Sequence, residues 1–323
     1  MGDANALVVG GLKGNRFGVL FTGVPVVMAA KGVETLQDDK WPTGRSGPSW
    51  RAKDCLLTSD DEVGKMIDIR ACTIGGDPTA ASRRFLVIGN SYSAAAFEMF
   101  TVLVEKRLGV VTVTSSWGAS AVPEIPNTTP WSKANSYYWD EVVPKLISGL
   151  SSGDVLIMVN DIAGLTPHET TDSTQQKLGQ LKSGLERLSH ELQKKGVSIV
   201  FLAPLPFMRD AACTPDMARP QWFNLGLPPI CLFHSRAYTM ARRKPVMEIL
   251  GAIESGHTNF RVLNLLPLYC ADATCAFFSA DKVPMYRDIY SHPSIEANFL
   301  ARPLLLAAIQ SLTLEDRGQS TPR

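Results

Sequence analysis

The chain has 323 residues, of which 45% are hydrophobic and 20% charged, and its formal net charge is +1. This profile is typical of a soluble globular protein with one large α/β domain or two small ones. The basic residues form no strong cluster, which argues against nucleic acid as a partner.

Residues 1–54 are predicted to form an N-terminal extension to a domain that covers 55–323. The extension contains the apolar run GVLFTGVPVVMAA (18–30), which is too short to span a membrane comfortably. This run fits a signal-peptide core, the remnant of a membrane helix, or a buried strand. The Gly-, Pro- and Ser-rich residues 35–55 are predicted to be a linker or an irregular extension.

From about residue 84, apolar runs and amphipathic segments alternate along the chain. β-Branched and apolar runs predict buried strands, and leucines at helical spacing predict helices. The predicted strands are 85–89, 110–115, 154–159, 197–204 and 260–268. The predicted helices are 92–108, a short one interrupted or started near Pro144, 172–195 ending at Gly196, 235–255, and 294–312, with loops at 121–135 and 205–235.

Alternating strands and helices predict a parallel sheet of about five strands with helices on both faces. In such sheets, ligands bind beyond the carboxyl ends of the strands. The residues that follow each predicted strand are therefore the first candidates for a functional site.

Three strand ends carry polar or small residues suited to acyl-transfer chemistry. Ser91 follows the first strand at a helix start, where its hydroxyl is exposed, although a helix cap is an alternative role. Gly118 follows the second strand and would bring a backbone N–H close to a substrate, although it fits a simple turn as well. Asn160 follows the third strand and could donate to an oxyanion, or form an Asx-turn, a role that Asp161 also fits.

Asp288 and His292 lie in one loop just before the last predicted helix. A histidine that acts as a general base needs a carboxylate to fix its tautomer, and this loop supplies both groups. Alternatively, His292 is an exposed residue of a helix-entry loop. His168 is a weaker candidate, and Trp117, Tyr286 and Tyr290 either line a pocket or pack in the core.

No helical histidine pair has metal-site spacing, and no Gly-rich phosphate loop is present, so no cofactor or metal is expected. The six cysteines fall in three sequence-local pairs without zinc-site spacing. They indicate either disulfides in an oxidising compartment or six reduced, mostly buried thiols. The cysteines are Cys55, Cys72, Cys213, Cys231, Cys270 and Cys275.

Taken together, these motifs resemble the SGNH hydrolase superfamily, named for its Ser, Gly, Asn and His blocks. VIGNSYS resembles the Ser block, with Asn90 where Asp is usual, and VND resembles the Asn block, with Val159 replacing Gly. The last block is normally DxxH, whereas Asp288 and His292 are separated by one extra residue. CTIGG before the Ser block and LYCADATC before the His block resemble the SGNH domain fused to membrane acyltransferases of family three.

The resemblance, which covers about residues 55–312, implies a flavodoxin-like three-layer α/β/α sandwich. It implies Ser91 as nucleophile, Asp288 and His292 as its partners, and an oxyanion hole formed by Ser91, Gly118 and Asn160. It also implies the pairs Cys55–Cys72, Cys213–Cys231 and Cys270–Cys275.

The function implied by the resemblance is serine-dependent O-acetyl transfer to cell-surface polysaccharide, with a carbohydrate or ester substrate and a membrane acyltransferase domain or partner. The expected location is periplasmic or extracytoplasmic, with a membrane tether through the N-terminus as one option. A carbohydrate esterase, a degenerate glycan-binding module and a flavodoxin-like nucleotide-binding protein are the alternatives, the last disfavoured by the missing phosphate loop.

Overall fold

The computed structural model of the protein describes residues 52–127, 130–162, 165–166, 171–206, 213, 215–218, 231–271, 273–279, 281, 283–288 and 290–318. The apolar run 18–30, most of the predicted extension 1–54, His168 and most of the predicted loop 205–235 lie outside these residues. Within them, no helix combines the length and apolar character that a membrane crossing requires.

The centre of the molecule is a six-stranded sheet with the order β2-β4-β3-β6-β7-β8. Five neighbouring strands are parallel, as predicted, and β2 pairs antiparallel with β4 at one edge. The predicted parallel α/β class is therefore confirmed, with one short edge strand added. The strands are β2 (Thr73–Ile74), β3 (Arg84–Gly89), β4 (Val110–Val113), β6 (Val155–Val159), β7 (Ser198–Leu202) and β8 (Phe260–Leu263).

The central strands are apolar on both sides because both faces of the sheet are covered. Alternate residues of β3 point to opposite faces, so Phe85 and Val87 join one hydrophobic cluster and Leu86 and Ile88 the other. All four side chains are at most 3% exposed.

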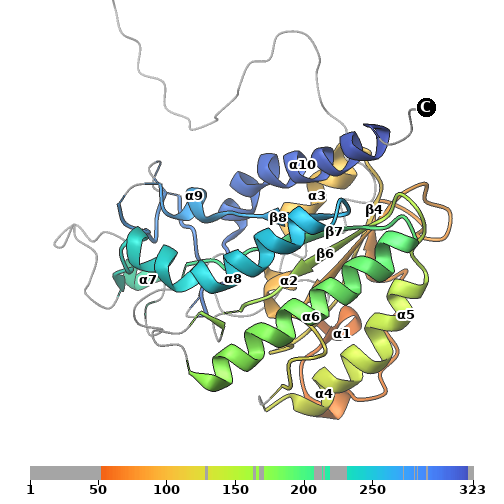
Figure 1. Cartoon of the computed structure of the whole chain (residues 1–323), viewed down its shortest axis with the longest axis horizontal. Coiled ribbons are helices and arrows are strands. Elements are labelled where there is room, and N and C mark those ends of the chain that lie inside the picture. The colour runs from red at the N-terminus through yellow and green to blue at the C-terminus, as the bar shows by residue number, and fades with distance from the viewer. Residues whose placement is uncertain are drawn as a thin grey trace, which may run out of the picture.

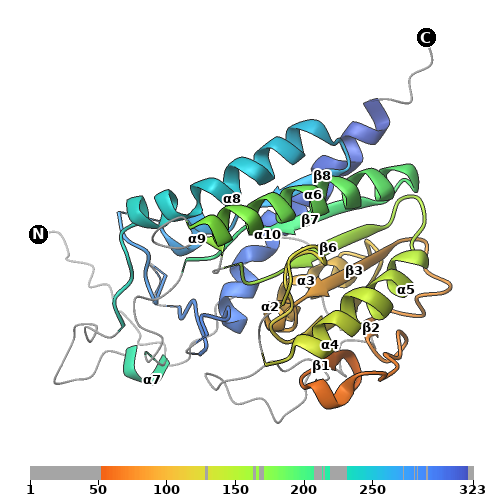
Figure 2. The same ribbon diagram turned by 60° about the horizontal axis from the view of Figure 1, so that its bottom comes forward.

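Helices form a layer on each face of the sheet (Figures 1 and 2). Helices α3 and α10 pack together on one side, and α5, α6 and α8 cover the other. The helices of these layers, with the short α2 and α4, are α2 (Ser91–Ala95), α3 (Phe97–Glu105), α4 (Ser132–Tyr137), α5 (Val143–Ser148), α6 (Asp172–Lys194), α8 (Arg236–Gly256) and α10 (Ile295–Gly318).

Smaller elements lie around this sandwich. β1 and β5 form a separate two-stranded parallel sheet, in which Leu56 and Leu57 pair with Ser115 and Ser116. These elements are α1 (Ala52–Cys55), β1 (Leu56–Leu57), β5 (Ser115–Ser116), α7 (Pro215–Ala218), α9 (Leu266–Tyr269), a 3-10 turn (Asp60–Glu62) and a π-helical turn (Tyr138–Val142).

The helix predicted at 172–195 is confirmed, and Gly196 follows it with φ +68°. The helix predicted at 92–108 is instead two helices that meet at Ala96. The loop predicted at 121–135 is too long, because α4 begins at Ser132. Pro144 lies in the first turn of α5, which directly follows the π-helical turn.

Candidate active site

Ser91 is the first residue of α2, directly after the turn that leaves β3. The turn needs glycine at position 89, because the backbone there has φ +153° and a Cβ would lie 1.8 Å from the carbonyl oxygen of Val159. β3 and β6 therefore approach closely just before both strands end. This approach brings the segment that begins with Ser91 next to the one that begins with Asn160.

Asn90 joins these two segments through its side chain. Its Oδ1 accepts hydrogen bonds from the backbone N–H groups of Tyr92 and Asp161, each at 3.1 Å. Its Nδ2 donates a longer bond of 3.4 Å to the carbonyl oxygen of Asp161. Asn90 thus caps α2 and fixes the turn after β6, a role that the sequence did not indicate.

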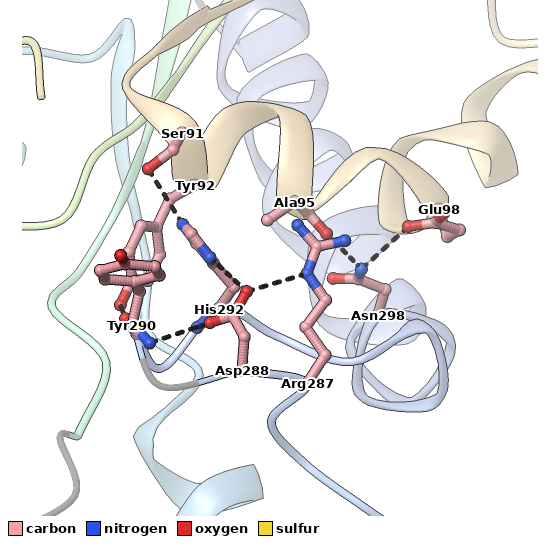
Figure 3. Close-up of polar contacts among 9 residues, drawn as sticks. All are labelled: Ser91, Tyr92, Ala95, Glu98, Arg287, Asp288, Tyr290, His292 and Asn298. Carbon is pink, nitrogen blue, oxygen red and sulfur yellow. Dashed lines mark hydrogen bonds and ion pairs between the residues drawn. The ribbon is translucent and has the colours of Figure 1, made fainter. Parts of the chain in front are cut away.

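Ser91, His292 and Asp288 form a hydrogen-bonded chain (Figure 3). His292 Nε2 lies 2.9 Å from Ser91 Oγ, and His292 Nδ1 lies 2.7 Å from Asp288 Oδ2. His292 and Asp288 are only 4% and 2% exposed. With the Nδ1 proton held by the carboxylate, Nε2 faces the serine hydroxyl as a proton acceptor.

The extra residue between Asp288 and His292 is absorbed by a tight turn. Asp288 Oδ1 accepts the N–H groups of Tyr290 and His292, at 3.0 and 3.3 Å, and Ser291 adopts φ +61°. Across the base of the turn, the N–H of Arg287 donates to the carbonyl oxygen of His292 at 3.0 Å. The departure from DxxH spacing is therefore compatible with a direct Asp288–His292 hydrogen bond.

A buried cation and a second carboxyl group lie behind Asp288. Arg287 Nε is 3.5 Å from Asp288 Oδ2, and Asn298 donates to Glu98 Oε2 at 3.1 Å and to the carbonyl oxygen of Ala95 at 2.8 Å (Figure 3). Burial raises the pKa of Asp288, but the hydrogen bond from His292 and the charges of His292 and Arg287 outweigh burial and lower the pKa below its ordinary value. Asp288 is therefore ionised at neutral pH.

Two tyrosines hold the imidazole ring in place. The ring of Tyr92 lies 4.7 Å from that of His292, centroid to centroid, and its hydroxyl donates to the carbonyl oxygen of Tyr290. Tyr290 is 63% exposed, with its ring 5.9 Å from that of His292. Tyr286 is fully buried in the core, as one of the two predicted alternatives required.

The side chain of Asn160 is buried but makes no hydrogen bond to a described residue. The residue is 3% exposed, and neither Nδ2 nor Oδ1 has a hydrogen-bond partner among the described residues. Gly89 pairs in register with Val159, so Asn160 follows β6 beside the Ser91 turn. A buried amide without a partner is uncommon and calls for an explanation, such as a ligand that it binds.

Gly118 is linked to the same turn through β5. Ser115 Oγ donates to the carbonyl oxygen of Asn90 at 2.6 Å, and the N–H of Trp117 donates to the carbonyl oxygen of Leu57 at 2.9 Å. Gly118 itself has φ +69°, and its carbonyl oxygen accepts from Asn127 Nδ2. The structure therefore anchors this segment to Asn90, but the hydrogen bonds that join Ser91 to Asp288 and His292 do not include Gly118.

The predicted disulfides are all formed: Cys55–Cys72, Cys213–Cys231 and Cys270–Cys275. Three disulfides indicate an oxidising, extracytoplasmic location. Among the described residues, no group of three or more His, Cys, Asp or Glu side chains could hold a metal ion. His190 is exposed on α6.

Several solved structures are similar to this chain. A proposed SGNH hydrolase from Slackia heliotrinireducens is 17% identical, with 70% of this chain and 98% of that chain covered and a TM-score of 0.40. An acetylxylan esterase from Geobacillus stearothermophilus is 14% identical, with 71% and 94% covered and a TM-score of 0.38. These similarities are too distant to indicate the activity of this chain.

No curated protein matches the chain. A family model described as the SGNH domain fused to AT3 domains matches residues 54–307. This match spans the whole sheet and the Ser91, Asn160 and His292 segments. The chain therefore belongs to the family of SGNH domains that are fused to AT3 domains.

Proposed function

We propose that the protein is a serine-dependent acyl-transfer enzyme that acts on carbohydrate esters, and specifically an O-acetyltransferase for cell-surface polysaccharide. The observation that carries this proposal is the hydrogen-bonded chain of Ser91, His292 and Asp288. Membership of a family fused to AT3 domains supports a membrane acyltransferase domain or partner as the source of the acyl group.

In the proposed mechanism, His292 Nε2 takes the hydroxyl proton while Ser91 Oγ attacks the carbonyl carbon of an ester. The resulting oxyanion accepts hydrogen bonds from the backbone N–H groups of Ser91 and Gly118 and from Asn160 Nδ2. When the intermediate collapses, the imidazolium returns its proton to the leaving alcohol. Asp288 stabilises the imidazolium throughout and stays ionised.

The acyl group on Ser91 then passes to a sugar hydroxyl or to water, with His292 again taking the proton of the attacking hydroxyl. The first acceptor gives transferase activity, and the second gives a carbohydrate esterase. Water access and the acceptor site decide between the two outcomes. The disulfides support a periplasmic site of action, where cell-surface polysaccharide is accessible.

Fluorophosphonate labelling with intact-mass detection tests the Ser91 mechanism. We expect one adduct per chain, located on Ser91 by peptide mapping, and no adduct on Ser91→Ala. Ser183→Ala is the matched control, because Ser183 lies exposed on α6 and donates only to a carbonyl oxygen of its own helix. An adduct that persists in Ser91→Ala, or a wild-type protein that neither labels nor cleaves p-nitrophenyl acetate, would contradict the proposal.

A second measurement separates transfer from hydrolysis. Wild-type protein is given an acetyl ester with and without a polysaccharide acceptor, and free acetate and acetylated acceptor are both quantified. The proposal expects the acceptor to gain acetyl groups at the expense of free acetate. Acetate release that is unaffected by any acceptor would favour the esterase alternative.

A further inference from the structure

A buried arginine lies in the wall of a small cavity at the carboxyl edge of the sheet. Arg243 is in the first half of α8 and is 3% exposed. Its Nη2 donates to Asn264 Oδ1 at 3.0 Å and contacts Met247 Sδ at 3.8 Å. Its Nε is buried without a hydrogen-bond partner among the described residues. Among the described residues, the guanidinium of Arg243 therefore contacts only uncharged groups, the Asn264 amide and the Met247 sulfur.

Among the described residues that line this wall, none carries a negative charge that would balance it. Arg242 contributes a second guanidinium, whose Nε donates to the carbonyl oxygen of Thr166 at 2.6 Å. Burial lowers the pKa of Arg243 to about 10 and also lowers that of Arg242, so both remain cations at neutral pH. No carboxylate is present among the described lining residues. Because an unpaired buried charge is costly, an anionic ligand would account for this arrangement.

The cavity lies at the same edge of the sheet as Ser91. Thr166 belongs to the connection that begins after β6 with Asn160, Leu205 follows β7, and Asn264, which holds Arg243, directly follows β8. In Figure 1, α8 begins on the side of the sheet where α9 follows β8. The cavity is thus located beyond the carboxyl ends of the strands next to the candidate active site.

Aromatic contacts connect the cavity to the loop that carries His292. Phe233, next to the lining residue His234, stacks on Tyr286 with ring centroids 5.1 Å apart. The hydroxyl of Tyr286 donates to the carbonyl oxygen of Pro206 at 3.0 Å, one residue after Leu205. Tyr286 lies two residues before Asp288, so the cavity wall and the catalytic loop are packed together.

The size of the cavity restricts the ligand. Its volume of about 10 Å³ holds about one water-sized group, so a sugar ring does not fit inside. A single carboxylate oxygen is small enough to enter, where a guanidinium N–H can donate a charge-assisted hydrogen bond to it. The rings of Tyr238 and His234, 4.2 Å apart, also line the cavity.

We propose that the Arg243 cavity binds the carboxylate of an acidic sugar unit, next to the unit that is acylated or deacylated at Ser91. The substrate would then be an acidic polysaccharide rather than a neutral one. This inference rests on the proposed function for its carbohydrate ligand, but carboxylate binding does not require any chemistry at Ser91.

The test compares two sugars that differ only in a carboxylate. Methyl β-D-glucuronide and methyl β-D-glucoside are titrated into the full chain and followed by NMR. Wild-type protein and Ser91→Ala are expected to bind the glucuronide at least tenfold more tightly than the glucoside. Arg243→Gln is expected to lose this preference, and Arg243→Lys to keep only part of it. Arg70→Gln is the control with the same charge change, because Arg70 is a 72% exposed side chain near the opposite edge of the sheet.

Equal affinity of the wild type for both sugars would overturn the inference, as would an equal loss of preference in Arg70→Gln. If inorganic phosphate binds more tightly than the glucuronide, the cavity is a general anion site and the inference of a carboxylate site is wrong. If Arg243→Gln does not fold, the wild type still provides a test. The side-chain Nε–H resonance of Arg243 must then shift when the glucuronide is added and must not shift when the glucoside is added. Selective binding without Ser91 labelling would disprove only the proposed function, and labelling without selective binding would disprove only this inference.

Discussion

Asn160 combines burial with an amide that makes no hydrogen bond to the described residues. If this amide serves the oxyanion, Asn160→Ala should lower kcat by about 10²–10³. The thermal stability of the Asn160→Ala variant should not fall, because the substitution removes no hydrogen bond to a described residue. Kinetics on an acetyl ester and thermal unfolding of the same samples provide the two measurements.

Asn259 is the matched control for that variant. Its Nδ2 donates to the carbonyl oxygens of Ser189 and Val197, both at 3.0 Å. Asn259→Ala should therefore lose about 1–3 kcal/mol of stability while the kcat of the folded protein is retained. A stable, fully active Asn160→Ala variant would remove Asn160 from the oxyanion hole.

The lowered pKa of Asp288 predicts how stability depends on acid. The ordinary pKa is 3.8 and the folded value is lower, so the unfolded state binds the proton first as pH falls. The stabilising contribution of the ionised Asp288 is complete above about pH 5 and is lost as pH falls through the folded pKa. The stability gap between wild type and Asp288→Asn should be constant above that pH and should shrink below it.

Urea unfolding of both proteins at a series of pH values measures this gap. A gap that stays the same down to about pH 2.5 would mean that Asp288 is not stabilised as a carboxylate in the folded protein. Sequence reasoning missed Tyr92 and Arg287. Tyr92 reaches His292 only through the tertiary fold, and Arg287 is next to Asp288 in the sequence, but the direction of its side chain has no sequence signature.

At the scale of elements, the strand-to-helix turn after β3 depends on Gly89. A Cβ at this position would overlap the carbonyl oxygen of Val159, and no small adjustment can relieve contact with a backbone atom. Gly89→Ala should therefore cost more than about 3 kcal/mol, beyond the usual range for one substitution. Because the same turn carries Ser91, labelling of any folded remainder should fall as well.

Gly179→Ala provides the comparison. Gly179 lies exposed in α6, and a Cβ there meets no atom within 4 Å. Alanine should stabilise this helix by about 0.5–1 kcal/mol, because it loses less backbone entropy on folding. Chemical unfolding of the two variants under the same conditions gives the difference. Equal stability of the two would show that β3 and β6 can separate at Gly89.

The five parallel strands could be predicted because each is a mostly apolar or β-branched run between turn residues, and four of them are almost entirely buried. Other elements had no such signal. β2 has only two residues, and the helix break falls on Ala96, although alanine has the highest helix propensity. The π-helical turn at 138–142 and the start of α4 at Ser132 likewise had no distinct pattern in the sequence.

The arrangement of the candidate site was predictable where residue type and strand end coincide. Ser91 and Asn160 follow strands, so topology alone places them at one edge. The turn at Asp288 was not predictable, because a positive φ at Ser291 is unusual for serine and has no sequence signature. The arginine cavity combines Thr166 after β6, Leu205 after β7 and residues of α8, and no local pattern could reveal this combination.

At the scale of the whole molecule, Cys55–Cys72 is connected through β1 and β5 to the segment that carries Gly118. It joins the end of α1, next to β1, to the residue before β2, and β1 in turn pairs with β5, which leads to Gly118. Cys55→Ser with Cys72→Ser should cost about 3 kcal/mol, because the bond closes a loop across a separation of 17 residues.

Cys270→Ser with Cys275→Ser is the comparison, since its separation is only 5 residues and the expected cost is about 2 kcal/mol. Thermal unfolding ranks the two double variants, and ester turnover well below both midpoints reports the site. We expect turnover to fall more for the first pair. If the Cys55→Ser, Cys72→Ser variant keeps the wild-type rate, the position of β5 does not depend on the Cys55–Cys72 disulfide.

The hydrogen bond between Ser91 and His292 joins residues 201 positions apart. During synthesis, the serine segment emerges long before the histidine loop, and contacts of such separation form late because a large loop must close first. A partly made or partly folded chain would therefore have an inert serine. The acquisition of fluorophosphonate reactivity in a refolding reaction should coincide with the docking of α10 against α3, so the same reagent that tests the chemistry also times this docking.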